Sequence, residues 1–350
     1  MKKFTKGCLM TALVLFIVGF VVCMVCGLLG GFRQLEEMDG LGWIPFRYSR
    51  NAIGGVEFGF LGHEVEILGD IDDIGDIGDI GGIGNIDEKK QLPLTADTLG
   101  DIDIDVERCN VRILRSEDEY VWFLVGVEGD SHDMELPRYT IENDGAKSDL
   151  CIENEVKHPI NHWMDGANDM TLYLWLPDGC ALEECEIDVG AGVMDSIFLK
   201  ARQVDVSLGA GSLKAAGFEG DEVNLEVEAG ELLAGRVIAG KADFEVGAGT
   251  LNIEELLVSR EADISVSAGN CGITGTITGE LELKCDVGSA QMHLTGSEDD
   301  HSYEVRGMGE IMVGSYRHDG FAAERSWNAG KGSLFDIDCN LGTVTVTFEE

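Results

Sequence analysis

The chain has 350 residues, of which 65 are Asp or Glu and 25 are Lys or Arg, and its formal net charge is −40. Such an acidic surface excludes nucleic acid and anionic lipid headgroups as partners of the folded part, and it favours cations or basic peptides. The 47 glycines and five prolines predict β structure with many tight turns.

The N-terminal segment predicts a membrane anchor. Residues 1–6 form a basic cytoplasmic tail, and residues 7–32 contain no charged side chain. This apolar run exceeds the ~20 residues that cross a bilayer as a helix. Lysines before it and one arginine after it place the N-terminus in the cytoplasm. A cleaved signal peptide is the competing interpretation. We expect a single-pass protein of the cell membrane with an extracytoplasmic C-terminal domain.

Residues 33–98 are predicted to form a juxtamembrane stalk and linker. Trp43 and Tyr48 lie either at the lipid headgroup level or in a flexible stalk. From Ile67 to Ile86 the chain repeats Ile-Gly-Asp triplets. This composition is typical of a low-complexity linker, and weak calcium binding by its aspartates is the alternative.

Residues 99–350 are predicted to be one all-β domain, an elongated β-solenoid of stacked strand repeats. Alternating segments occur at 101–106 and 170–176, and from residue 186 the phrase EIDVGAGVM returns in varied form. A fixed repeat of about 19 residues indicates a stack in which each unit completes its core only against its neighbours. We assign the glycines that close each phrase to the corners of the solenoid: Gly192, Gly211, Gly230, Gly249, Gly269, Gly288 and Gly342.

Within each repeat the apolar residues alternate with polar ones. In the first repeat, Ile187, Val189 and Ala191 are predicted to face the core while Asp188 faces solvent. The same phase applies to the later repeats, so their Ala residues are also expected to face inward.

The last part of the chain departs from the repeat. Residues 314–332 are predicted to form an inserted surface loop, and residues 335–348 restore the phrase as a capping coil. The loop concentrates basic and aromatic side chains in an otherwise acidic domain. We therefore name it as a candidate contact surface, with residues Arg317, His318, Arg325 and Trp327.

The cysteines and histidines give no metal site. Seven cysteines lie outside the membrane segment, an odd number without a CxxC pair, which predicts neither zinc nor a complete disulfide framework. Cys271 and Cys285 are predicted to be buried small hydrophobes, whereas a local disulfide between Cys180 and Cys185 stays open. His158 and His162 have helical metal-ligand spacing, but nearby Pro159 argues against a helix.

No motif indicates catalysis, and we expect neither an enzyme nor a cofactor. The sequence lacks a GxSxG elbow, a phosphate-binding loop and an HExxH pair. A remote alternative is a polysaccharide-acting β-solenoid enzyme with aspartates on its outer face. Its candidates would be Asp188 and an acidic ladder in which Asn224 takes part, with Asp205, Asp243 and Asp263.

The order of motifs resembles a known family. The strand LYLWLPDG, the phrase EIDVGAG and the later glycine-marked strands are similar to the bacterial putative-adhesin β-strand-repeat family, also called toastrack domains. The resemblance implies a membrane-tethered extracytoplasmic β-stack, common in Gram-positive bacteria, without catalytic residues. Its relatives are associated with envelope stress, which implies an interaction module that pairs with an envelope protein or a second copy. A surface adhesin or receptor whose acidic face binds cationic peptides or calcium is the alternative.

Overall fold

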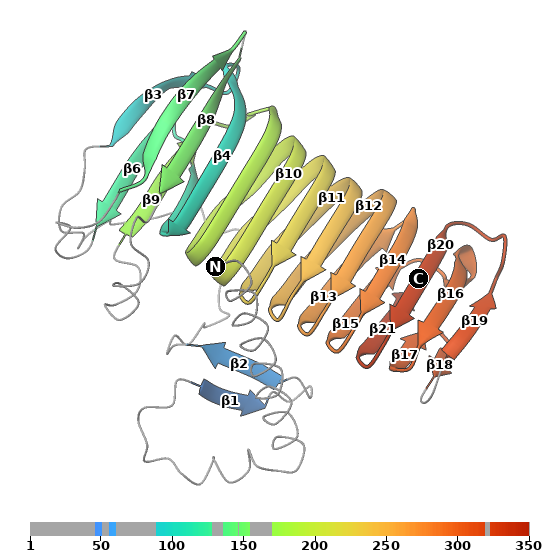
Figure 1. The fold of residues 1–350 in the computed structure, drawn as a ribbon. Helices are drawn as coiled ribbons and strands as arrows, with labels where there is room; N and C mark the ends of the chain where they lie inside the picture. The colour runs from blue at the N-terminus through green and yellow to red at the C-terminus, as the bar shows by residue number, and fades with distance from the viewer. Residues whose placement is uncertain are drawn as a thin grey trace, which may run out of the picture. The chain divides into compact units, whose positions relative to one another are not determined.

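A computed structural model describes residues 46–50, 56–60, 89–127, 136–145, 147–154, 170–318 and 323–349 (Figure 1). The chain divides into two compact units, one up to Gly69 and one from Asp70. In the first unit, β1 (Phe46–Arg50) and β2 (Val56–Phe60) pair as an antiparallel hairpin. The predicted tail 1–6, membrane segment 7–32 and Ile-Gly-Asp run lie outside the described residues.

Among the described ranges, no helix has the length and apolar character needed to cross a bilayer.

The second unit is an all-β stack whose strands wind from coil to coil (Figure 1). Neighbouring coils pair in parallel, so that Leu225 lies beside Phe244 and Phe244 beside Ile264. The longest strands pass through more than one side of a coil because the alternating pattern continues around the bend. The central strands are β10 (Leu182–Val227), β11 (Glu231–Val246), β12 (Thr250–Val266), β13 (Asn270–Ile277), β14 (Glu280–Cys285) and β15 (Ser289–Thr295).

The inward side chains of successive coils form columns in one continuous core. In one column every member is no more than 2% exposed. A buried side chain of this kind stabilises the fold by ~1.5–3 kcal/mol, and the next coil supplies the contact that one repeat lacks. This confirms the predicted stacked-strand fold. The column contains Ile104, Ile187, Val206, Leu225, Phe244, Ile264, Leu283, Ile337 and Val305.

The alanines of the repeat phrase do not face the core. Ala210, Ala229 and Ala248 are exposed, so the predicted inward orientation was wrong for these residues. In each repeat the alternation of inward and outward side chains ends at the apolar residue that comes before the alanine, because the chain turns there. At the turn the backbone pairs with the preceding coil, as where the Ala229 N–H donates to the Gly209 carbonyl at 2.9 Å. The buried apolar residue after the glycine, for example Leu232, restarts the inward set.

The glycines that the sequence assigned to the corners form one column along the stack. A Cβ on Gly230 would lie 2.7 Å from the Gly211 carbonyl oxygen and 2.8 Å from Leu208 Cδ2. Only Gly211 in this column has a positive φ, at 135°. Close approach of neighbouring coils, more than backbone conformation, therefore requires glycine here. In spatial order the column runs Gly192, Gly211, Gly230, Gly249, Gly269, Gly288, Gly342 and Gly309.

At the C-terminal end the spatial order differs from the sequence order. The coil of β20 and β21 pairs with β14 and β15 on one side and with β16 and β17 on the other. The predicted cap at 335–348 is therefore an internal coil, and antiparallel β18 and β19 end the stack. These elements are η2 (Glu298–Asp300), β16 (Ser302–Gly307), β17 (Glu310–Val313), β18 (Tyr316–His318), β19 (Ala323–Trp327), β20 (Leu334–Cys339) and β21 (Thr343–Glu349).

The N-terminal end has a similar arrangement. The predicted first coil, β4 with β5, pairs with β10 on one side and with β8 and β9 on the other. Antiparallel β7, β6 and β3 lie beyond, and β3 precedes the expected domain start at residue 99. The strands are β3 (Lys90–Thr95), β4 (Leu99–Arg108), β5 (Asn110–Arg115), β6 (Tyr120–Val127), β7 (Arg138–Asp144), β8 (Lys147–Asn154) and β9 (Met170–Leu176).

The seven described cysteines are free thiols. Cys271 and Cys285 are buried in the core, as predicted, and burial raises the pKa of Cys271 to about 12. Cys185 is also in the core, in register with Ile102. The Cys180 thiol instead donates to the Pro177 carbonyl at 3.2 Å. Cys180 and Cys185 therefore have different surroundings and are not joined.

Candidate binding face

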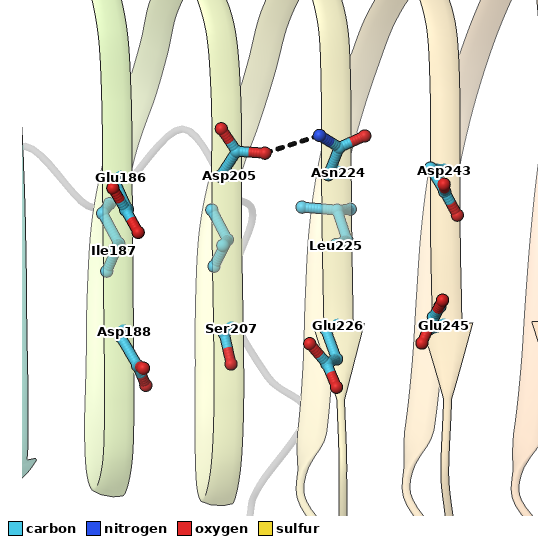
Figure 2. Close-up of a pocket in the computed structure, with 11 residues that line it drawn as sticks. Glu186, Ile187, Asp188, Asp205, Ser207, Asn224, Leu225, Glu226, Asp243 and Glu245 are labelled. Carbon is cyan, nitrogen blue, oxygen red and sulfur yellow. Dashed lines mark hydrogen bonds between the residues drawn. The ribbon is translucent and has the colours of Figure 1, made fainter.

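Two columns of polar side chains lie side by side on the outer face of neighbouring coils (Figure 2). They arise because side chains two residues apart on a strand share a face, and because parallel pairing repeats this spacing on the next coil. Between them, the backbone of Ile187, Val206 and Leu225 forms the floor of a groove. The first column contains Glu186, Asp205, Asn224 and Asp243, and the second contains Asp188, Ser207, Glu226 and Glu245. We call these eight residues the acidic groove.

The first column is the ladder that the sequence predicted, extended by one residue. Asn224 pairs in register with Asp243, which pairs with Asp263. The Asn224 side-chain N–H donates to the Asp205 carboxylate, and Gln203 Nε2 donates to the same carboxylate at 2.8 Å. These donors hold Asp205 in place, so one ladder position has a fixed orientation.

Four carboxylates of the acidic groove have a raised pKa and ionise less readily than isolated ones. Partial burial, and then repulsion from Asp105 and Glu228, raises the pKa of Asp188. The pKa values of Glu186, Glu226 and Asp243 are also raised, in each case first by burial and then by neighbouring carboxylates. A bound cation would relieve this repulsion. The groove therefore has the electrostatic character of a cation-binding surface.

Beyond the groove, the same columns acquire basic partners. Lys241 lies 3.5 Å from both Glu261 and Asp263, and Arg306 lies 2.7 Å from Asp336. Among the residues that line the acidic groove in the described part of the chain, none is basic. Lys241 lies at the edge of the groove, where its charge opposes part of the rise in the pKa of Asp243.

The other side of the coils has a different character. Its outward column contains Thr250, Asn270, Ser289 and Thr343, which pair in register and are uncharged. The column continues into an acidic residue at each end, because Glu231 pairs with Thr250 and Glu310 pairs with Thr343.

The acidic groove does not form a compact metal site. Within the described ranges, no group of three or more His, Cys, Asp and Glu side chains is arranged to hold a metal ion. The ladder spreads its carboxylates along the stack, with adjacent coils about 4.8 Å apart. Such a row suits an extended ligand with several positive charges. The predicted pair His158 and His162 lies outside the described residues.

The residues of the candidate contact surface lie on strands, where the sequence predicted a loop. Arg317 and His318 belong to β18, and Arg325 and Trp327 belong to β19. Trp327 stacks on Tyr303, with ring centroids 4.6 Å apart. Arg325 lies 5.0 Å from the centroid of the Tyr316 ring, and Arg317 lies 3.1 Å from Glu310. These side chains hold the end of the stack together, and their contact with a partner stays a prediction.

Sequence reasoning missed that Glu186 and the second column belong to the same groove. It treated Asp188 separately because this residue has a different phase from Asp205. The two phases are two residues apart and therefore share one face. Writing the repeats beneath one another at their 19-residue spacing would have placed Asp188 in line with Glu226 and Glu245.

The family follows from the fold and from a match to a family model. The toastrack DUF4097 model matches residues 99–310, which is more than half of the chain, and the chain belongs to this family. The matched residues include strands β10 to β15, which form the central stack in Figure 1. No curated protein matches the chain.

The chain is also similar to several solved structures, all at low sequence identity. A putative adhesin from Bacteroides fragilis is 11% identical, with 75% of this chain and 97% of that chain covered and a TM-score of 0.39. A putative adhesin from Parabacteroides distasonis is 14% identical, with the same coverages and a TM-score of 0.35. A putative lipid binding protein from that species is 13% identical, with coverages of 76% and 98% and a TM-score of 0.30.

Proposed function

We propose that this toastrack protein is a non-catalytic binding protein of the cell envelope, anchored by residues 7–32. Its acidic groove binds a cationic segment of a peptide or of an envelope protein. The observation that carries the proposal is the pair of adjacent columns, in which six carboxylates line one groove without a basic residue among its described lining residues. A role in sensing or resisting envelope stress is the setting that we propose for this binding.

Binding can be tested with the full chain in mild detergent and an oligolysine peptide. We expect affinity that falls as salt rises, because salt screens exposed charges. The triple variant Glu186→Gln, Glu226→Gln and Glu245→Gln should weaken binding about tenfold, since each exposed charge pair contributes about 0.2–1 kcal/mol.

The matched control removes the same number of charges elsewhere. Glu117, Glu119 and Glu254 are exposed and do not line the groove, so their replacement by Gln should leave affinity nearly unchanged. Equal weakening by both variants would indicate attraction by net charge alone and would contradict a localised site. Calcium at equal ionic strength serves as the competing ligand, and displacement of the peptide by calcium but not by sodium would favour the calcium alternative.

Partner identity is a separate question. Crosslinking in intact cells, followed by purification at high salt, should recover an envelope protein with a cationic segment. Recovery of a second copy of this chain would favour self-association. A clean monomer without crosslinked species would contradict the interaction role.

A further inference from the structure

Two cysteines that are distant in the sequence lie on neighbouring coils in the core. Cys285 ends β14 and Cys339 ends β20, and the two are in register in the parallel pair. This pairing exists only because β20 inserts beside β14, out of sequence order. Both side chains are buried, with 1% and 0% of their surface exposed.

We propose that Cys285 and Cys339 form a disulfide bond that joins the two coils. Residues in register on adjacent parallel strands lie about 4.8 Å apart. This separation falls within the ~4.4–6.8 Å between Cα atoms that disulfides span. The Cys285 thiol donates to the Thr343 carbonyl at 3.9 Å, on the coil that carries Cys339.

The packing around the sulfur atoms accommodates the bond. The inward column that leads to the pair contains Val227, Val246 and Val266, whose γ carbons occupy the space beside the next corner glycine. Cys285 Sγ occupies the equivalent space beside the corner glycine Gly342, because a Cβ built on Gly342 would lie 2.6 Å from this sulfur atom. It therefore faces the coil that carries Cys339.

Cys339 Sγ lies beside Gly309, on the following coil. Its sulfur must rotate about χ1 to another staggered position to meet Cys285. The rotation moves it back into the same inward column. In-register Cβ atoms on parallel strands lie about as far apart as the strands, ~4.8 Å, so the two coils must also draw together by a few tenths of an ångström to reach the ~3.5–4.5 Å between the Cβ atoms of a disulfide.

Formation of the Cys285–Cys339 disulfide requires an oxidant, and glutathione disulfide is a suitable one. The neighbouring Cys285 thiol lowers the pKa of Cys339 from its usual value, so Cys339 supplies the attacking thiolate. It forms a mixed disulfide and releases one glutathione, and Cys285 then displaces the second glutathione. Two S–H bonds and the glutathione S–S bond break, and one protein S–S bond forms. The two electrons and two protons leave on two glutathione thiols.

The oxidant can reach the two cysteines because they lie near one end of the stack. Beyond the Cys339 coil the stack contains only β16 and β17 with their antiparallel partners, among the described strands. Stack ends open more readily than the centre. An extracytoplasmic domain, as proposed above, would meet such oxidants. The chemical test below does not depend on that location.

The test uses the full chain in detergent, incubated with reduced and oxidised glutathione just below its unfolding temperature. Free thiols are then alkylated in denaturant, and peptides are analysed without reduction. We expect a linked Cys285–Cys339 peptide with the mass of two hydrogens missing. Reductant should lower the Tm of the oxidised protein on the order of 10 °C, because the bond closes a loop of about 54 residues.

Two variants and one internal standard complete the design. Cys285→Val places the usual column residue at this site and should abolish both the linked peptide and the reductant effect, whereas Cys271→Val should retain both. Cys151 is partly exposed, so its adduct with glutathione reports that oxidation has occurred. Recovery of Cys285 and Cys339 as free thiols once Cys151 is modified would overturn the proposal. Linkage of either residue to another cysteine would do the same.

Discussion

At the scale of single residues, the corner glycines are explained by steric contact. Carbonyl oxygens of the preceding coil occupy the space that a side chain would need, as at Gly249 and Gly269. The sequence predicted the corners from spacing alone. In the column only Gly211 has a positive φ.

We expect Gly230→Val to destabilise the stack. Its Cβ alone would require the Gly211 backbone and Leu208 to move, and overpacking of this kind typically costs about 1–3 kcal/mol. Thermal unfolding followed by circular dichroism measures the effect. The control is Ala229→Val, one residue earlier at the exposed tip of the same turn, which should change Tm little. An unchanged Tm for the glycine variant would contradict the corner assignment.

At the scale of elements, the short antiparallel strands at each end protect the stack. A parallel coil leaves unpaired N–H and C=O groups on both edges, which invites further pairing. β18 contains only three residues, and β3 contains Pro93, which cannot donate to a neighbouring strand. β20 and β21 instead have parallel partners on both edges, although they form the last coil in the sequence.

We expect Trp327→Ala to loosen the C-terminal end. Trp327 packs against both Tyr303 and Tyr316, at centroid distances of 4.6 and 4.9 Å. Loss of a large aromatic side chain costs about 3–5 kcal/mol when it is buried, and less is expected here because Trp327 is only partly buried. Hydrogen exchange should increase in β16–β19 and remain unchanged in β10. Phe198→Ala, at an exposed aromatic residue (38% exposed), is the control. Uniform exchange changes along the stack would contradict a local cap.

At the scale of the whole molecule, carboxylates with raised pKa values link stability to pH. The pKa values of Asp103, Glu186, Asp188, Glu226 and Asp243 are raised in the folded state. The folded chain therefore binds protons more strongly than the unfolded chain between the unfolded and folded pKa values. In that window stability falls as pH rises and increases as pH falls.

We accordingly expect a higher Tm at pH 5 than at pH 7, at constant ionic strength. The exposed Asp118, whose pKa is lowered mainly by a hydrogen bond from Trp122, acts in the opposite direction. Differential scanning calorimetry provides the measurement. The variant Glu186→Gln, Glu226→Gln and Glu245→Gln should show a smaller gain because Glu186 and Glu226, whose pKa values are raised in the folded state, no longer titrate. A Tm that decreases steadily from pH 7 to pH 5 would refute the linkage.

The sequence alone determined the features that depend on local periodicity. The 19-residue spacing predicted stacked coils, and the alternation around Ile187 and Leu225 predicted which side chains face the core. The first acidic column also followed from this phase. These predictions succeed because each depends on residues within one repeat, and the repeat imposes the same contacts on the next coil.

Only the tertiary structure decided how non-adjacent segments pair. It placed β20 and β21 inside the stack, brought Cys285 beside Cys339, and joined the columns of Asp205 and Asp188 into one groove. Backbone pairing is nearly indifferent to side-chain identity, so an alternating strand fits an edge or an interior position equally well by pattern. Which edge it occupies depends on competition among all coils for hydrogen-bonding partners, and no single segment records that outcome.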